Sequence, residues 1–306
     1  MHWADVIAEE LGVKGKHHVI ATGITPSGEI HLGNMREILT ADAICRALRR
    51  RNVSAEMIYV ADTFDPLRKK YPFLSDEYEQ HIGKPLSRIP CPCGSHENYA
   101  LHFLEPFLAS LDELGVSYQM VQTHELYRDG KYAPYVKQAI EHRDEIKKIL
   151  EDKSHRKLNS SWFPYSAICS RCGRFTNRIT GYENGFVSYI CDCGNESRVN
   201  VNTDGGKLPW RIDWPARWGF LNVTCEPFGK DHATVGGSYD TAKCITEKVF
   251  EREAPYPVVY EWIHLKGKGA MHSSTGVAIN IKDMISSTSP EIIRFLMMRV
   301  NPGKHI

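Results

Sequence analysis

The hydrophobic pattern near the start of the chain changes from a short continuous run to a helical spacing across one turn of small residues. Residues 17–22 form a short run that contains β-branched residues, and Gly23, Pro26 and Gly28 break it. From about Asn34, apolar positions recur at helical spacing. The recurring positions are Ile38, Leu39, Ala41, Ile44 and Leu48. This pattern predicts a strand, a turn and a helix in that order.

The rest of the chain continues to alternate between strand-like and helix-like patterns. Strands are predicted at residues 55–61, 117–122 and 257–263. Helices are predicted at residues 1–14, 101–114, 132–150 and 290–299. The first helix is expected to place Trp3, Val6, Ile7 and Leu11 on one side, and the last has Ser289 as its cap and Pro290 in its first turn. The alternation predicts an α/β fold with a parallel sheet, which we expect to be interrupted after about residue 71 and to resume near Lys207.

The turn at residues 25–34 lies at the edge of such a sheet where ligands bind, because helix amides and the helix dipole attract anions there. His31 adds a donor that can become cationic as charge builds on a phosphoryl group. The residues alone predict a nucleotide-phosphate site, and the alternative is an ordinary helix-start loop. Asp62 and Asp65 follow the next strand at the same edge and could hold an ammonium group, although Asp65 is equally suited to capping the turn before Pro66.

Composition and charge limit the classes of protein to which this chain can belong. The 306 residues suffice for one large or two ordinary domains, and 42% hydrophobic content is normal for a globular protein. A net charge of +1 gives no global sign of a nucleic-acid partner; the basic clusters at residues 46–51 and 147–157 fit either solvated helix faces or RNA-backbone contacts. No apolar run approaches the roughly 20 residues that cross a membrane, and residues 1–14 lack a secretory pattern, so we expect a cytoplasmic protein without a membrane partner.

Four of the nine cysteines have the spacing of a zinc ribbon. Cys169 and Cys172 form one pair, Cys191 and Cys193 form the other, and residues 184–185 supply the Asn-Gly turn of a hairpin between them. Disulfides are the alternative, but they persist mainly in oxidising compartments. We therefore expect a structural zinc ion held by these four thiolates.

A second group of metal ligands is predicted upstream. Cys91, Cys93 and His96 are close in sequence and His102 is the candidate fourth ligand, although local Cys and His residues can also be packing residues. The remaining cysteines lie in apolar surroundings and are expected to be buried: Cys45, Cys225 and Cys244.

Several motifs, taken in order, resemble one enzyme family. Residues 25–28 with 31–34 resemble the HIGH element of class I aminoacyl-tRNA synthetases, and Asn34 in the last position, followed by Arg36 and Glu37, resembles the class I lysyl-tRNA synthetases. Residues 228–232 resemble the Gly-x-Asp-His loop that borders the nucleoside and the amino acid.

The second mark of the class is the KMSKS loop, which residues 264–276 resemble with two departures. Ala270 and Thr275 stand where the motif's lysines would be. Those lysines neutralise triphosphate charge, and the neighbours close enough in sequence to substitute for them are Lys266, Lys268 and His272.

The resemblance implies a role for each matching residue. The catalytic residues implied are His31, Asn34, Met271, Ser273 and Ser274. The ATP-binding residues implied are Thr25, Pro26, Ser27, Gly33, Asp231, His232 and Gly237. The lysine-binding residues implied are Gly23, Thr25, Asp62, Trp210 and His232. The substrates implied are L-lysine, ATP with Mg²⁺, and tRNA(Lys).

The resemblance also implies a domain plan. The two halves of a Rossmann-like catalytic domain would occupy residues 1–75 and 205–285, with a helical connective insertion at 76–160 and the zinc ribbon at 161–204. Residues 286–306 would begin a helical anticodon-binding region of which most is lacking. The competing hypotheses are a class I synthetase-like enzyme for another amino acid and a non-catalytic RNA-binding paralogue.

Overall fold

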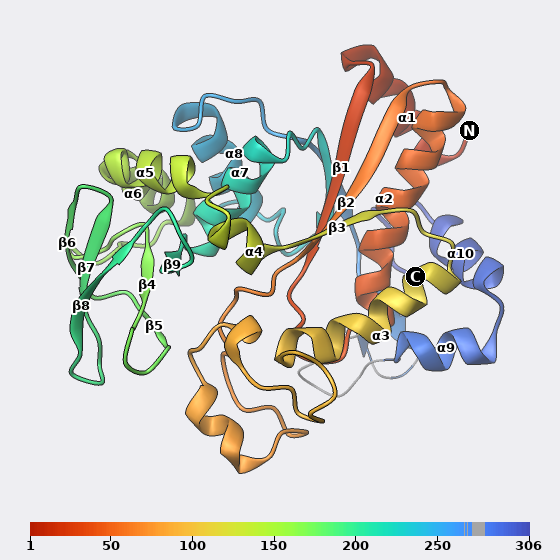
Figure 1. Cartoon of the computed structure of the whole chain (residues 1–306). Helices are drawn as coiled ribbons and strands as arrows, with labels where there is room; N and C mark the ends of the chain where they lie inside the picture. Colours follow the sequence, from red (N-terminus) through yellow and green to blue (C-terminus); the bar gives the residue numbers. More distant parts are fainter. Residues whose placement is uncertain (266, 268, 271–278) are drawn as a thin grey trace.

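A five-stranded parallel sheet forms the centre of the molecule (Figure 1). The computed structural model describes residues 1–265, 267, 269–270 and 279–306. Across the sheet the strands follow the order β11-β10-β1-β2-β3, and each neighbouring pair is parallel. Their bounds are β1 His17–Ile24, β2 Ser54–Ala61, β3 Gln119–Gln122, β10 Cys225–Gly229 and β11 Tyr256–Tyr260. The predicted α/β class with a parallel sheet is therefore confirmed.

Helices cover both faces of this sheet because its strands alternate between two apolar cores. In β1, Ile20 and Ile24 belong to the main core, whereas Ala21 belongs to the cluster around Trp214 on the opposite face. The main core packs against α1 Trp3–Lys14, α2 Leu32–Arg50, α3 Tyr99–Glu113, α9 Ile281–Ser287 and α10 Pro290–Met298. The opposite face packs against α7 Trp210–Phe220 and α8 Ser238–Lys248.

The first helix begins close to its predicted position, but its buried side differs from the prediction. Val6 is 42% exposed, while Ala4, Ala8 and Leu11 are buried. Trp3 and Ile7 are only partly buried against the core. The small alanine side chains let α1 lie close to α2, so the contact face is centred on them rather than on the bulkier residues.

The segment between β2 and β10 corrects two expectations about the sheet. The strand predicted at residues 117–122 was assigned to the interruption, yet β3 pairs with β2 at the edge of the parallel sheet. Near Lys207 the short strand β9 Gly206–Lys207 pairs with β4 Ser166–Ile168 instead, and the parallel sheet resumes only at β10. Strand pairing depends on distant partners that local periodicity does not specify.

Residues 133–207 lie mostly away from the sheet, at the left of Figure 1. The predicted helix at residues 132–150 is divided at His142 into α5 Ala133–Glu141 and α6 Arg143–Ser154. The helices before them are η1 Asp76–His81, η2 Leu86–Arg88 and α4 Thr123–Arg128. The small antiparallel sheets contain β5 Phe175–Thr176, β6 Ile179–Glu183, β7 Phe186–Ile190 and β8 Glu196–Asn200, and a final pair is β12 His264–Leu265 with β13 Gly269–Ala270.

Local turn and cap predictions agree well with the structure. Asn184 and Gly185 both have positive φ, 50° and 82°, and they join β6 to β7 as the Asn-Gly hairpin signal predicts. Ser289 is the N-cap of α10 and Pro290 is its first residue, although the serine side chain makes no capping hydrogen bond.

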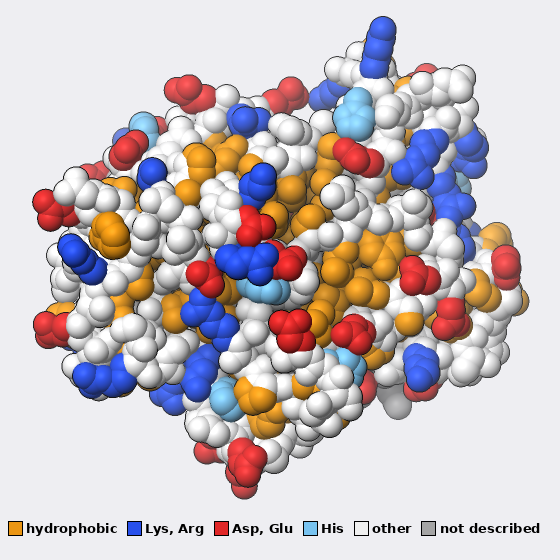
Figure 2. Space-filling model, in the orientation of Figure 1, with side chains coloured by type: hydrophobic (Ala, Val, Ile, Leu, Met, Phe, Trp, Pro, Cys, Tyr) orange, Lys and Arg blue, Asp and Glu red, His pale blue; other side chains and the backbone are white. Residues whose placement is uncertain are grey.

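The surface shows no face of a single charge sign in the view of Figure 2, where acidic and basic side chains are interspersed. The basic run at residues 46–51 is partly engaged within the molecule, since Arg50 and Arg51 pair with Asp5 at 3.2 and 2.9 Å. Within the described part of the chain, every helix is too short or too polar to cross a membrane.

Candidate active site

A cavity of about 490 Å³ opens at the carboxyl ends of β1, β10 and β11. The chain runs outward from β1 to β2 and β3 on one side and from β10 to β11 on the other, so the strand order reverses between β1 and β10. Open α/β sheets bind ligands at this kind of reversal. The residues that line the cavity are Gly23, Ile24, Thr25, Ser27, His31, Gly33, Asn34, Glu37, Lys69, Tyr71, Gly229, Asp231, His232, Tyr260, Glu261, Trp262 and Ile263.

His31 is the N-cap of α2, and this role fixes the orientation of its ring. Its Nδ1 accepts a hydrogen bond from the Gly33 N–H at 3.0 Å, and Asn34 Oδ1 accepts one from the His31 N–H at 3.3 Å. Because Nδ1 accepts, the ring proton sits on Nε2, which makes Nε2–H the donor of the ring. The cap of α2 therefore sets both the orientation of the ring and the nitrogen that carries its proton.

The turn before His31 is held by hydrogen bonds from distant parts of the chain. The Tyr99 hydroxyl donates to the carbonyl oxygen of Ser27 at 2.8 Å, and the Tyr71 hydroxyl donates to Ser27 Oγ at 3.3 Å. Thr25 Oγ1 donates to Asp65 Oδ2 at 3.2 Å. The turn is thus a preorganised surface rather than a loose loop. A second cavity of about 460 Å³ lies on its other side and shares Thr25, Ser27, His31, Asn34 and Tyr71 with the first.

Glu37 is a cavity residue that sequence reasoning missed. Its carboxylate accepts the Gly23 N–H at 2.9 Å and the Tyr260 hydroxyl at 2.7 Å. Burial raises the pKa of Glu37 to about 8. The sequence spacing could have indicated that Glu37 is a site residue. His31, Asn34 and Glu37 recur every three residues and so share one side of α2. No lysine or arginine of the described residues pairs with this carboxyl group, so it is suited to receiving a cation from a ligand.

The neighbouring Arg36 has a structural role. Its side chain is 1% exposed and donates to the backbone carbonyls of Glu261, Pro302 and Lys304. These bonds attach residues 302–304 to the end of β11. Arg36 and Glu37 therefore have different roles. Arg36 binds backbone carbonyl groups, whereas Glu37 faces the cavity.

The structure brings most of the predicted site residues together. Those that line the two cavities are Gly23, Thr25, Ser27, His31, Gly33, Asn34, Asp231 and His232. Pro26 lies within the turn without lining either cavity, and Gly237 is the N-cap of α8. Trp210 is outside the lining too, stacked on Trp214 at 5.1 Å and with its ring 6.1 Å from that of His232. Met271, Ser273 and Ser274 lie outside the described residues.

Asp62, predicted to bind an ammonium group, already holds two cations of the chain itself. It is 3% exposed, pairs with Arg217 at 2.9 Å and lies 3.5 Å from Lys207. Lys207 also pairs with Asp65 at 2.5 Å and lies 3.9 Å from Asp213. Burial opposes ionisation of Asp62, but the two cations outweigh it and hold the pKa of Asp62 below its usual range. The structure thus leaves Asp62 beneath the cavity instead of in it.

The four ribbon cysteines converge as a tetrahedral metal site requires. Sγ of Cys169 lies 3.6 Å from that of Cys193, and Sγ of Cys172 lies 3.6 Å from that of Cys191. Zinc bound to sulfur at about 2.3 Å separates its tetrahedral ligands by roughly 3.8 Å. All nine cysteines are free, so the disulfide alternative finds no support. These residues could hold a metal ion.

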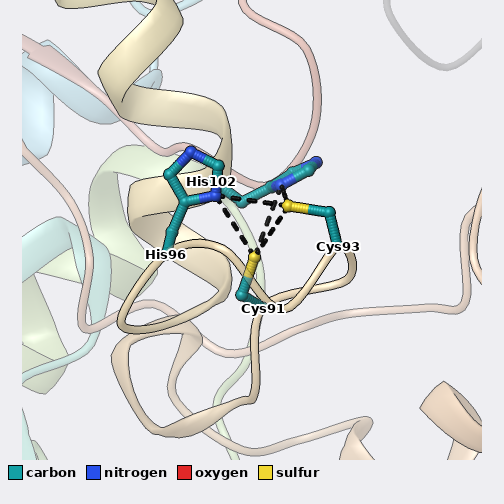
Figure 3. A group of neighbouring side chains, drawn as sticks. All are labelled: Cys91, Cys93, His96 and His102. Carbon is teal, nitrogen blue, oxygen red and sulfur yellow. Dashed lines mark hydrogen bonds between the residues drawn. The ribbon is translucent and has the colours of Figure 1, made fainter.

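The second predicted metal group also converges (Figure 3). Nδ1 of His96 lies 3.3 Å from Cys91 Sγ and 3.4 Å from Cys93 Sγ, while Nδ1 of His102 lies 3.5 and 3.2 Å from the same two atoms. Burial opposes ionisation of Cys91, but hydrogen bonds from His96 and Cys93 lower the pKa of its thiol to about 5, which favours the metal-binding thiolate. These four residues could hold a metal ion. Of the other cysteines, Cys45 and Cys225 are buried as predicted and Cys244 is only partly buried.

Comparison with known proteins gives the family. The sequence model of the family described as tRNA synthetases class I (K) matches residues 1–306. The chain therefore belongs to this family of class I tRNA synthetases.

Individual relatives agree with this assignment. A lysine--tRNA ligase of Methanosarcina barkeri (strain Fusaro / DSM 804) is 53% identical over 309 residues, which cover 100% of this chain and 57% of the relative. A lysine--tRNA ligase of Archaeoglobus fulgidus is 50% identical over 307 residues, which cover 100% of this chain and 62% of the relative. The chain thus spans about three fifths of the length of these relatives.

Among solved structures, a tyrosyl-tRNA synthetase from Aeropyrum pernix aligns with a TM-score of 0.49 at 12% identity, covering 89% of this chain and 61% of that one.

Proposed function

We propose that this chain carries the amino-acid-activating site of a lysine--tRNA ligase. The observation that carries the proposal is one cavity at the strand-order reversal that has a helix N-terminus with His31 and Asn34 on one wall and the carboxyl group of Glu37 on another. The first is suited to phosphate and the second to an ammonium group. Relatives that carry the name lysine--tRNA ligase match the whole chain.

The proposed reaction has two steps. A carboxylate oxygen of lysine attacks the α-phosphorus of ATP, the bond to the bridging oxygen breaks, and pyrophosphate leaves. The ribose hydroxyl at the end of tRNA(Lys) then attacks the acyl carbon of the adenylate, AMP leaves, and the hydroxyl proton is lost to solvent. Mg²⁺ that accompanies ATP supplies additional neutralisation of phosphate charge. The protein's contribution is alignment and charge stabilisation.

Each cavity residue has a role in this proposal. The Nε2–H of His31 and the Asn34 side chain bind phosphate oxygens as charge builds on them, and the positive end of the α2 dipole adds to this stabilisation. Glu37 binds the side-chain ammonium group of lysine, with Tyr260 orienting its carboxylate. Gly23, Thr25 and His232 border the amino acid. Because Asp62 and Trp210 lie outside the lining, we assign them to the support of that pocket rather than to contact with lysine.

Both cysteine-containing groups are proposed to bind structural zinc. Four ligands fill a tetrahedral zinc site and leave no position for substrate. The Cys91 group lies near the turn at residues 25–34. Tyr99 lies between His96 and His102 in the sequence, and its hydroxyl donates to the Ser27 carbonyl. Because charging of tRNA takes place where tRNA is used, the cytoplasm is the compartment that this proposal implies.

ATP–pyrophosphate exchange with each amino acid in turn tests the proposed function. Lysine-dependent exchange is the expected result. Exchange driven by a different amino acid would make the chain a synthetase-like enzyme of other specificity. No exchange with any amino acid, in a folded protein that still binds tRNA, would favour a non-catalytic RNA-binding paralogue.

A further inference from the structure

Residues 69–73 lie against the turn at residues 25–34 and contact it at two points. The Tyr71 hydroxyl donates to Ser27 Oγ at 3.3 Å. The Phe73 ring packs on Gly28, where an added Cβ would lie 3.5 Å from Phe73 Cζ. Tyr71 and Phe73 also stack on each other, with ring centroids 5.4 Å apart and planes 6° apart. These contacts fix the backbone beside Lys69, whose Nζ lies 5.5 Å from the centroid of the Tyr71 ring.

The three consecutive basic residues 68–70 are used differently. Arg68 lies 3.6 Å from Asp65, and Lys70 pairs with Asp76 and Glu79 on the side away from the cavity. No carboxylate of the described residues pairs with Lys69, and its side chain lines the larger cavity beside Tyr71. The fold therefore neutralises both neighbours and leaves the middle cation at the site.

Lys69 is also the single lysine or arginine among the described residues that line either cavity. The carboxyl groups in the same linings belong to Glu29, Glu37, Asp231, Glu261 and Asp283. Glu261 already pairs with Lys230, and burial raises the pKa of Glu37. The other three carboxylates still repel a polyphosphate unless a cation offsets their charge. In the sequence, Ala270 and Thr275 occupy the positions where the KMSKS pattern has lysines.

We infer that Lys69 binds the β- and γ-phosphates of ATP and the pyrophosphate formed from them. This inference rests on the proposed function for the identity of the reaction, and it adds a catalytic residue from the segment after β2. An ammonium group on a flexible stem is suited to this task, because it can follow phosphate oxygens as the bond to the α-phosphorus lengthens.

Calorimetric titration of the 306-residue chain with ATP and with AMP, each with Mg²⁺, tests the inference. The variants are Lys69→Met, Lys69→Arg and the matched control Lys70→Met, which removes the same charge one residue away. Lys69→Met is expected to weaken ATP binding about 10- to 100-fold, the usual range for a charged hydrogen bond, while AMP affinity changes by less than about twofold. Lys69→Arg is expected to keep most ATP affinity, and Lys70→Met to resemble the wild type.

Two results would overturn the inference. One is equal ATP affinity in Lys69→Met and Lys70→Met. The other is an equal loss for ATP and AMP, because AMP lacks the phosphates that Lys69 is assigned to bind. Failure of the proposed function is a separate outcome. If Lys69→Met loses affinity for ATP but not for AMP, and the wild type exchanges pyrophosphate without a lysine requirement, then Lys69 keeps its role and lysine is removed as the substrate.

Discussion

The Tyr260 hydroxyl donates a hydrogen bond of 2.7 Å to Glu37, joining the carboxyl end of β11 to the second turn of α2 across the candidate active site. The same carboxyl group accepts the Gly23 N–H from the end of β1 at 2.9 Å. The consecutive elements β1 and α2 and the remote strand β11 therefore meet at one ionisable group. Burial raises its pKa to about 8, so at neutral pH the free protein holds Glu37 mostly protonated.

Lysine affinity should increase with pH up to about 8. An ammonium ligand pairs with the carboxylate form, so below pH 8 lysine must displace the Glu37 proton, which costs up to about tenfold in affinity per pH unit. The lysine side chain, with a pKa near 10.4, stays charged throughout. Equilibrium dialysis of labelled lysine between pH 6 and 8.5 measures the slope.

Glu37→Gln is the control for this titration, because the amide keeps the side-chain shape without an ionisable group. It should bind lysine weakly and with an affinity that barely changes over the same pH range. A wild-type dissociation constant that is equal at pH 6 and pH 8 would show that Glu37 is not the ammonium acceptor.

Sequence reasoning succeeded where the governing interactions are local. The helix start near Asn34 and the Asn184–Gly185 hairpin turn depend on neighbours a few residues away. The four ribbon cysteines form two close pairs in sequence, and one hairpin of about 20 residues brings the pairs together. The ionic partner Arg217, by contrast, is 155 residues from Asp62, so nothing beside Asp62 in the sequence indicated that its charge was already satisfied. Glu37 was missed for a related reason. A glutamate inside an amphipathic helix usually faces solvent, and the Tyr260 hydroxyl that contacts this one comes from 223 residues away.

His31→Ala should lower the rate of adenylate formation by about 10²-fold or more, because one well-placed transition-state donor is typically worth 10²–10³. Alanine also removes the cap of α2, which costs about 0.5–2 kcal/mol of stability. His31→Asn separates the two effects, since asparagine is a good cap but cannot replace the ring donor. Pyrophosphate-exchange rates and thermal midpoints of both variants give the comparison. Wild-type exchange in either variant would remove His31 from the chemistry.

Purified protein should contain two zinc ions per chain, one in each convergent group. Replacing Cys169, Cys172, Cys191 and Cys193 with serine should leave one ion, held by the Cys91 group, and should destabilise the ribbon because metal binding contributes directly to its folding. Cys244→Ser, outside both groups, is the matched control and should retain two. Metal analysis by mass spectrometry counts the ions. An unchanged count in the quadruple variant would exclude the ribbon as a zinc site.

Lys207→Met should destabilise the fold by about 3–5 kcal/mol at neutral pH, the range for breaking a buried ion pair. The variant would leave Asp62, Asp65 and Asp213 with Arg217 as their one buried cation, since Arg68, 3.6 Å from Asp65, is mostly exposed. Its deficit should shrink toward pH 4. The lowered pKa of Asp62 stabilises the wild type above the ordinary carboxyl pKa, and that effect is lost only below it. The smaller deficit near pH 4 therefore comes from the variant, whose carboxylates can take up protons once Lys207 is gone. Urea unfolding at pH 4.5 and 7 measures both effects.

Lys14→Met is the control, since Lys14 and its partner Glu253 are mostly exposed and such pairs contribute about 0–1 kcal/mol. Equal losses in the two variants would mean that the buried cluster contributes no more than a surface pair.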